Sequence, residues 1–493
     1  MANSNRGRQA ATGIAGLDEV LRGGLPRDRI YLIEGHPGAG KTTLALQFLL
    51  QGAADGERCL YITLSETAEE IRAVADSHGW NLDGLTLIEL SALEQTQMLE
   101  QQNTLFEASE VELQETTRRL LDHVDKIQAE RVVLDSLSEL RLMAQGSLRY
   151  RRQILGLKQH FNAQNCLVLL LDDLSGDGDT QVQSLAHGVL HLEQEAPLYG
   201  EDRRRLRVLK LRGQAFRGGY HDFAIQTGGI RVFPRLRALE HGAEFSREPV
   251  SSDVPELDTL LNGGLERGTS TLITGPAGAG KSVIATQFAL AVSARGEKSA
   301  ILCFDESVGT LITRSRSLGL PIDEYLASEQ LTVAQIDPAE LGPGEFAHKT
   351  KELVDQGARL IVIDSLNGYL NSMPDERLLT VQMHELLSFL GQRGVTTIVV
   401  MAQHGLLGNM MSPVDVSYLA DTVLLLRYFE AEGRIRKAIS VVKKRSGPHE
   451  DTIRELSLGQ RGIKVGAPLV SFSGVLTGVP RYLGQSSALS GKD

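Results

Sequence analysis

Two glycine-rich stretches of this chain have the residue types and spacing that bind phosphate. Residues 35–42 read GHPGAGKT and residues 275–282 read GPAGAGKS, so both fit the pattern G-x-x-x-x-G-K-[ST]. In such a loop the backbone N–H groups surround phosphate oxygens, the lysine reaches the β- and γ-phosphates, and the hydroxyl ligates Mg²⁺. The pattern therefore predicts that the chain binds ATP with Mg²⁺ twice.

The residues predicted to contact ATP are the two loops and the first helical residues after them. In the first half of the chain they are Gly35, His36, Pro37, Gly38, Ala39, Gly40, Lys41, Thr42 and Thr43. In the second half they are Gly275, Pro276, Ala277, Gly278, Ala279, Gly280, Lys281, Ser282 and Val283.

An acidic partner for the metal follows an apolar run in each half. Asp135 comes after Val132-Val-Leu, and Asp364 comes after Ile361-Val-Ile. A phosphate-binding loop needs such a carboxylate at the end of a neighbouring strand to hold Mg²⁺. The predicted metal ligands are therefore Thr42, Asp135, Ser282 and Asp364.

Hydrolysis also needs a group that orients or deprotonates the attacking water. Glu66 and Glu306 stand at matching distances after the two loop lysines, and Asp305 makes an acidic pair with Glu306 where the first half has Ser65. We predict a catalytic role for Glu66, Asp305 and Glu306. The alternative is that the two glutamates only cap the helices that follow them.

A cationic strand appears late in each half. It carries Lys210 and Arg212 in the first half, and Lys443 and Arg445 in the second. The residues alone leave two interpretations open. These cations are either solvated surface charges or groups that reach the γ-phosphate bound by a neighbouring subunit and stabilise the transition state.

Short apolar runs separated by helical segments must position these residues. The runs are 30–34, 59–63, 131–135 and 167–171, then 270–274, 300–304, 360–364 and 396–401. Such runs are typical of buried parallel strands. Each loop falls between a strand and an amphipathic helix, which places the phosphate at a helix N-terminus.

The chain is a duplication, because residues 17–66 align with residues 257–306 without a gap. We predict an α/β fold with two tandem P-loop NTPase domains, each a mainly parallel sheet flanked by helices. The expected boundaries are a first domain at 1–235, a linker at 236–253, a second domain at 254–475 and a flexible tail at 476–493.

Composition restricts the class of protein. With 493 residues the chain exceeds one hydrophobic core, and 42% hydrophobic and 23% charged residues are ordinary for a soluble globular protein. No apolar run approaches the roughly 20 residues of a membrane span, and no signal peptide is visible, so we expect a cytoplasmic protein without a membrane partner. The net charge of −11 argues against nucleic acid as a partner.

Taken together, these motifs resemble the KaiC family, double-domain RecA-like ATPases named for a circadian-clock protein. The shared features are the tandem loops, the Leu-Asp…Gly-Gly-Leu approach to each, the Asp-Ser strand ends and the Lys-x-Arg strands, over about residues 10–480. The resemblance implies a homohexamer with ATP and Mg²⁺ between subunits. It also implies that Lys210, Arg212, Lys443 and Arg445 act on the neighbour's nucleotide.

The family's phosphorylated Ser-Thr pair falls on Ser417-Tyr418, so the resemblance offers Ser417 as a phosphoacceptor. Three departures limit the likeness: Ser65 replaces an acidic residue, Tyr418 replaces the threonine, and little chain follows residue 481. We therefore predict an ATP-hydrolysing hexameric signalling protein with serine autokinase activity, acting with an unidentified signalling partner. The alternatives are a RecA/RadA-like nucleic-acid-dependent ATPase and an ATP-switched scaffold with little turnover.

Overall fold

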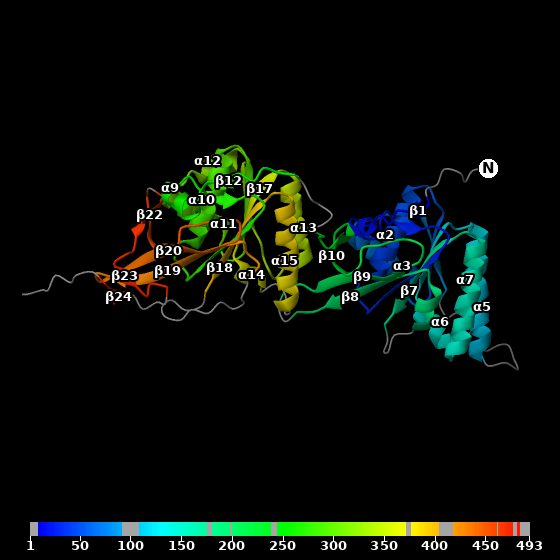
Figure 1. Ribbon diagram of the computed structural model, residues 1–493. Helices are drawn as coiled ribbons and strands as arrows, with labels where there is room; N and C mark the ends of the chain where they lie inside the picture. The colour runs from blue at the N-terminus through cyan, green and yellow to red at the C-terminus, as the bar shows by residue number, and fades with distance from the viewer. Residues whose placement is uncertain are drawn as a thin grey trace, which may run out of the picture. The chain divides into compact units, whose positions relative to one another are not determined.

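The computed structural model describes residues 8–90, 108–174, 180–197, 200–237, 244–370, 376–403, 418–460, 462–476 and 481–483. Contacts within the chain divide it into Met1–Arg235 and Leu236–Asp493, here called unit 1 and unit 2 (Figure 1). The predicted linker at 236–253 contains the buried Leu236 and the two-residue strand β12 (Pro249–Val250), both in unit 2. The limits of the domains themselves stay a prediction.

Unit 1 contains one nine-stranded sheet whose order is β11-β10-β9-β8-β3-β7-β6-β4-β5. Strands β8, β3, β7, β6, β4 and β5 are parallel, and β9, β10 and β11 continue the sheet antiparallel. The strands are β3 (Ile30–Gly35), β4 (Cys59–Thr63), β5 (Leu85–Glu89), β6 (Arg131–Asp135), β7 (Leu167–Asp173), β8 (Gly188–Glu195), β9 (Arg203–Leu211), β10 (Tyr220–Gln226) and β11 (Gly229–Phe233), with a separate pair β1 (Gln9–Ala10) and β2 (Leu25–Pro26).

Helices cover both faces of this sheet, which explains why its central strands are buried along their whole length (Figure 1). One core cluster joins the sheet to α2 and α3, and another joins it to α5, α6 and α7. The helices of unit 1 are α1 (Leu17–Val20), α2 (Lys41–Ala54), α3 (Ala68–Ser77), α5 (Ala108–Ile127), α6 (Leu137–Ala144), α7 (Ser147–Ala163) and α8 (Thr180–Leu185).

Unit 2 repeats this sheet strand for strand, in the order β16-β15-β17-β18-β14-β19-β20-β21-β22. Its strands are β13 (Leu265–Glu266), β14 (Ser270–Gly275), β15 (Lys298–Cys303), β16 (Leu331–Gln335), β17 (Ala358–Asp364), β18 (Thr396–Ala402), β19 (Thr422–Ala431), β20 (Arg434–Lys444), β21 (Arg454–Gly459), β22 (Gly462–Pro468), β23 (Phe472–Ser473) and β24 (Arg481–Tyr482). Its helices are α9 (Pro255–Leu260), α10 (Lys281–Ala294), α11 (Val308–Ser317), α12 (Ile322–Ala327), α13 (Pro343–Asp355), α14 (Leu366–Leu370) and α15 (Glu376–Gln392).

The predicted fold class is confirmed, since each unit is a mainly parallel sheet between helices. Each of the eight predicted apolar strands lies on an observed strand, and the predicted cationic strands fall on β9 and β20, which end one residue before Arg212 and Arg445. The antiparallel strands β10, β11, β21 and β22 were not predicted. Of the predicted tail, the part that the structure describes includes β24, which pairs with β23. Residues 477–480 and 484–493 lie outside the described residues.

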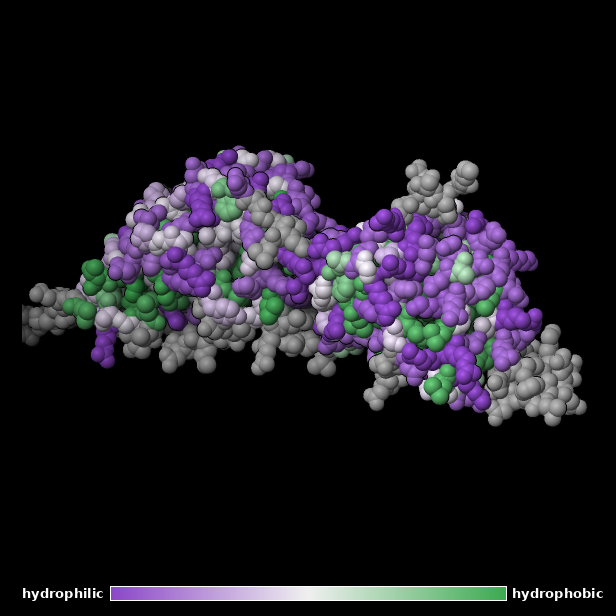
Figure 2. Space-filling model, turned by 45° about the vertical axis from the view of Figure 1, so that its right-hand side comes forward, coloured by the Kyte–Doolittle hydropathy of each residue, from purple (hydrophilic) through white to green (hydrophobic). Residues whose placement is uncertain are grey.

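On the face of each unit that Figure 2 shows, hydrophilic residues predominate and hydrophobic residues form patches. The three cysteines are buried, as expected for small core residues. A search of the described helices found none long and apolar enough to span a bilayer.

Candidate functional site

The first glycine-rich loop connects the end of β3 to the start of α2. Gly38 and Gly40 have φ of 83° and 96°, a region that other residues rarely adopt. A Cβ on Gly40 would lie 2.7 Å from Ile225 Cδ1 on β10 of the same sheet, so the Ile225 side chain would have to move to admit it. No side chain caps the N-terminus of α2, which leaves its N–H groups directed at the loop. The backbone thus forms an anion cradle of the predicted kind.

Lys41 is held inside this loop. Its Nζ donates hydrogen bonds to the carbonyl oxygens of Gly35 at 2.9 Å and His36 at 3.0 Å. It also forms an ion pair with Asp173 Oδ1 at 2.7 Å, from the end of β7. No sequence motif indicated this third contact, because Asp173 comes from a distant strand that pairs with β3.

Asp135 lies against the loop hydroxyl, as the spacing predicted. Thr42 Oγ1 donates to Asp135 Oδ2 at 3.3 Å, and Tyr61 OH donates to the same oxygen at 2.6 Å. Burial raises the pKa of Asp135, and the hydrogen bonds from Tyr61 and Thr42 act against that increase. A carboxylate and a hydroxyl side by side are the hard oxygen donors that Mg²⁺ prefers. These residues therefore fit a magnesium ion that completes its shell with phosphate oxygens and water.

Glu66 lies just beyond the end of β4 and is not a helix cap. The N-cap of α3 is Thr67, whose side chain accepts a hydrogen bond from Glu70 N at 3.2 Å. Glu66 Oε2 is buried and has no hydrogen-bond partner. Burial raises the pKa of Glu66, and the carboxylates of Asp135 and Glu70 raise it further. An unpaired buried carboxyl oxygen near Asp135, the predicted metal ligand, is what a water-activating group needs.

The second loop repeats this geometry between β14 and α10. Gly278 and Gly280 have φ of 74° and 111°, and a Cβ on Gly280 would lie 2.9 Å from Leu458 Cδ1. Lys281 Nζ donates to Pro276 O at 2.8 Å, and burial lowers the pKa of this lysine. Asp364 ends β17, burial raises its pKa, and the Ser282 side chain acts against that increase.

The two carboxylates of the acidic pair in unit 2, Asp305 and Glu306, have different partners. Ser365 Oγ donates to Asp305 Oδ2, while Arg314 Nη1 lies 2.7 and 2.5 Å from the two oxygens of Glu306. The N-cap of α11 is Ser307, so Glu306 is not a cap either. The capping alternative is therefore wrong in both units.

The Lys-x-Arg segments lie far from the loops of their own units. Lys210 donates to Gln183 O and Arg212 donates to Ser184 O at 2.9 Å. The backbone of Arg212 bonds to His187, which bonds to Ile30, the first residue of β3. The loop begins at the other end of that six-residue strand, about 17 Å away. The structure does not bring Arg212 and Lys41 together within one unit.

Unit 2 has the same arrangement. Lys443 donates to Ala420 O at 2.7 Å and Arg445 donates to Tyr418 O at 3.0 Å. The backbone of Arg445 bonds to Asp421, which bonds to Ser270 at the start of β14. The predicted phosphoacceptor Ser417 lies outside the described residues, and Tyr418 beside it is 54% exposed.

Comparison with known proteins gives one consistent family. The family model for the KaiC ATPase matches residues 10–237 and again residues 250–470. The circadian clock protein KaiC2 of Synechocystis is 29% identical over 95% of this chain and 83% of its own length. The circadian clock oscillator proteins KaiC of Acaryochloris marina and Synechococcus elongatus are 28% and 27% identical, over 95% and 97% of this chain and 90% and 93% of their own lengths.

Proposed function

This chain belongs to the KaiC family of ATPases, and we propose that it hydrolyses Mg·ATP in both units and works as a homohexameric signalling protein. One observation carries the proposal. In each unit a buried loop lysine, a loop hydroxyl and a strand-end aspartate converge at the N-terminus of a long helix, as Lys41, Thr42 and Asp135 do in unit 1. Helix N-termini of this kind bind phosphate.

The side chains divide the work in each unit. Bound Mg·ATP supplies the phosphoryl group and the metal charge that polarises it. Lys41 and Lys281 hold the β- and γ-phosphates, while Thr42 with Asp135 and Ser282 with Asp364 hold the metal. Glu66 orients and deprotonates the attacking water in unit 1. Asp305 and Glu306 do so in unit 2.

The position of the Lys-x-Arg segments supports self-assembly. Arg212 and Arg445 lie a strand length away from the loop of their own unit, so they do not reach a γ-phosphate bound there. Lys210 and Lys443 precede them by two residues and donate to backbone oxygens. This placement supports action on the nucleotide of another copy. Exposed apolar side chains flank these cations, with Leu209 36% and Val442 55% exposed. In a closed ring every subunit gives its cations to one neighbour and its loop to the other.

Phosphate release by the purified full-length chain tests the enzyme proposal. Wild type should release phosphate from Mg·ATP, Lys41→Ala and Lys281→Ala should each remove part of the rate, and the double variant should remove nearly all of it. Lys126→Ala, on the exposed surface of α5, is a matched control expected to leave the rate unchanged. Equal rates in wild type and the double variant would contradict the proposal.

Assembly is tested by light scattering with and without ATP. A particle of six chains should form, and Arg212→Ala or Arg445→Ala should lower the turnover of assembled protein without abolishing ATP binding. If an active ATPase remains monomeric throughout, the trans role of these cations is wrong.

We further propose serine autokinase activity at Ser417, on the resemblance described above. The adjoining Tyr418 is exposed and accepts a hydrogen bond from the proposed trans-acting Arg445, which would bring this segment near a neighbour's γ-phosphate. Mass spectrometry after incubation with Mg·ATP should find phosphate on Ser417, and Ser417→Ala should lose it. If Ser417 stays unmodified, the autokinase proposal is wrong and only the ATPase proposal stands.

A nucleic-acid-dependent ATPase needs clustered basic side chains, and the clearest cluster in the sequence is Arg203-Arg-Arg205 on β9. Arg204 pairs with Asp202 at 3.4 Å and Arg205 pairs with Glu193 at 3.2 Å. Acidic side chains of unit 1 thus compensate these two charges, which argues against the nucleic-acid alternative. The scaffold alternative differs from an ATPase in turnover alone, so tight ATP binding without phosphate release would favour it.

A further inference from the structure

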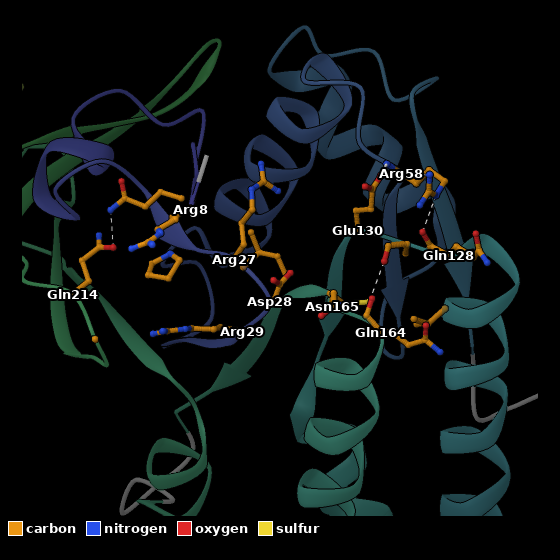
Figure 3. A pocket seen from close by; sticks show the side chains of 17 residues that line it. Arg8, Arg27, Asp28, Arg29, Arg58, Gln128, Glu130, Gln164, Asn165 and Gln214 are labelled. Atoms are coloured by element: carbon orange, nitrogen blue, oxygen red, sulfur yellow. Dashed lines mark hydrogen bonds and ion pairs between the residues drawn. The ribbon is translucent and has the colours of Figure 1, made fainter. Parts of the chain in front are cut away.

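A cavity of about 950 Å³ opens in unit 1 at the amino ends of β3, β6 and β7 (Figure 3). The phosphate-binding loop follows the carboxyl end of β3, so the cavity and the loop lie at opposite edges of the sheet. The volume is in the range of small-molecule sites. The nucleotide chemistry described above uses no side chain of this cavity.

The wall of the cavity carries an excess of positive charge. Of its four arginines, Arg27 pairs with Glu57 at 2.6 Å and Arg58 lies 3.6 Å from Glu130. Arg8 and Arg29 form no ion pair with any described carboxylate, and Arg29 donates only to the backbone oxygen of Arg212. Guanidinium groups bind phosphate or carboxylate through paired hydrogen bonds, so this wall favours an anion.

Three polar residues on the same wall adopt backbone conformations that favour glycine. Asp28, Gln128 and Asn165 have φ of 57°, 51° and 55°. By the register of the strands that follow them, their counterparts in unit 2 are Gly268, Gly357 and Gly394. Glycine takes this conformation without strain, whereas a side chain has a cost there. Unit 1 therefore keeps three polar side chains around one cavity at positions where its own repeat has none.

Unit 2 closes the corresponding place with an aromatic ring. A Cβ on Gly268 or on Gly394 would come within 2.5 Å of Phe245. The two uncompensated arginines are also missing there, because Glu248 and Thr269 stand where unit 1 has Arg8 and Arg29. Unit 1 thus has a polar cavity lined by arginines at this place, whereas unit 2 has the side chain of Phe245 there.

We propose that this cavity is a ligand site, separate from the nucleotide loops, for a phosphate ester of a small hydroxylated molecule, of which a sugar phosphate is the simplest case. Arg8 and Arg29 bind the phosphate, and Asp28 accepts hydrogen bonds from hydroxyl groups. The amides of Gln128 and Asn165 bind the remaining polar atoms. Figure 3 shows Arg8, Arg29 and Asp28 on one side of the cavity and Gln128 on the other.

Calorimetric titration of the full-length chain tests this site. Both nucleotide loops are first saturated with Mg²⁺ and a non-hydrolysable ATP analogue, and glucose 6-phosphate, glucose and inorganic phosphate are then titrated separately. Glucose 6-phosphate should bind more tightly than either fragment. Arg8→Glu should weaken it about tenfold or more, as expected for the loss of a charge-assisted contact.

Glycine substitutions separate a ligand role from a structural one. Asp28→Gly, Gln128→Gly and Asn165→Gly keep the left-handed backbone, so the unfolding temperature should stay equal or rise while affinity for glucose 6-phosphate falls. Gln145→Gly, at a left-handed position outside the cavity with φ of 50°, is the control and should leave affinity unchanged. Binding no tighter than that of inorganic phosphate, or equal affinity in the three variants, would overturn the proposal.

Discussion

The two units share a fold and a loop motif but surround their proposed catalytic carboxylates differently. In unit 1, Glu66 Oε2 is buried without a partner and its pKa is raised by burial. In unit 2, Arg314 holds both oxygens of Glu306. The counterpart of Arg314 on α3 is Val74, eight residues after the glutamate in each repeat. With Val74 in place of an arginine, Glu66 lacks the guanidinium partner that Glu306 has.

The loop lysines differ as well. Lys41 pairs with Asp173 at 2.7 Å, whereas β18 has Ala402 at the position that pairs with the end of β14. The phosphates must compete with Asp173 for Lys41, while Lys281 faces no such carboxylate among the described residues. Loop motifs establish that both units suit a nucleotide. The surrounding strands and helices determine how the two sites differ.

Removing the carboxylates should have the largest effect on this comparison. Glu66→Gln is measured with unit 2 silenced by Lys281→Ala, and Glu306→Gln with unit 1 silenced by Lys41→Ala. Loss of a general base should lower phosphate release by about 100-fold or more. We expect the full loss for Glu66 and a smaller one for Glu306, because Asp305 remains beside it. Equal losses of phosphate release in the two variants would show that Arg314 and Asp305 do not make the unit 2 site differ from the unit 1 site.

Breaking the buried ion pair at the amino end of β6 should have the second-largest effect. Arg131 is fully buried in unit 1 and pairs with Glu57 at 2.6 Å, whereas unit 2 has Leu360 at this register position. Glu57→Gln leaves Arg131 with the partly exposed Asp55, 3.2 Å away, as its remaining carboxylate partner. It should destabilise unit 1 by about 2–3 kcal/mol, less than the roughly 3–5 kcal/mol of a buried charge with no partner. The measurement is hydrogen exchange followed by mass spectrometry, which reports each unit separately.

The matched control for this variant is Glu297→Gln in unit 2. Glu297 pairs with Arg267 at 2.5 Å, but both side chains are partly exposed, and such a pair contributes about 1 kcal/mol or less. Similar destabilisation of the two units would mean that burial of Arg131 has no special cost.

Local sequence was enough to predict the loops, the strand-end aspartates and the glutamates after the second strand. Each of these follows from a few adjacent residues, and Thr42 does lie against Asp135. The fold class followed from alternating apolar runs. The antiparallel strands β10, β11, β21 and β22 were not predicted, because buried and more exposed residues alternate in them, as in β10, and do not form a continuous apolar run.

The missed partners join residues that only the fold brings together. Tyr61 has no equivalent in unit 2, where the position is Ile301, and Asp173 contacts Lys41 from a strand far along the chain. No short motif contains either pair. Arg314 could have been found by extending the gapless alignment of the repeats past Glu306, because it aligns with Val74 of the first repeat.

Exchanging these helix positions should sharpen the comparison with a moderate effect. Val74→Arg would give Glu66 the partner that Glu306 has and lower its raised pKa. A general base works when ionised, so turnover by unit 1 should fall as the pH drops through the raised pKa of Glu66. Val74→Arg should move this acid limb to lower pH. Rate profiles of unit 1, measured with and without Val74→Arg in protein whose unit 2 is silenced, report the shift. An unmoved limb would show that Glu66 does not set the pH dependence.

Helix capping should give the smallest difference between the units. Thr67 and Glu70 form a complete capping box at α3, whereas Ser307 accepts from Thr310 N at 3.2 Å and has no glutamate three residues later. Thr67→Ala should destabilise unit 1 by about 1 kcal/mol, and Ser307→Ala should destabilise unit 2 by less. Each cap adjoins a proposed catalytic glutamate, so hydrogen exchange of α3 and α11 should be compared with turnover by each unit. If Thr67→Ala loosens α3 and leaves turnover intact, β4 alone positions Glu66. If turnover by unit 1 falls when Thr67→Ala removes the cap, the start of α3 helps to position Glu66. The backbone of the capped helix would then hold the carboxylate of unit 1 in place, whereas Arg314 holds that of unit 2.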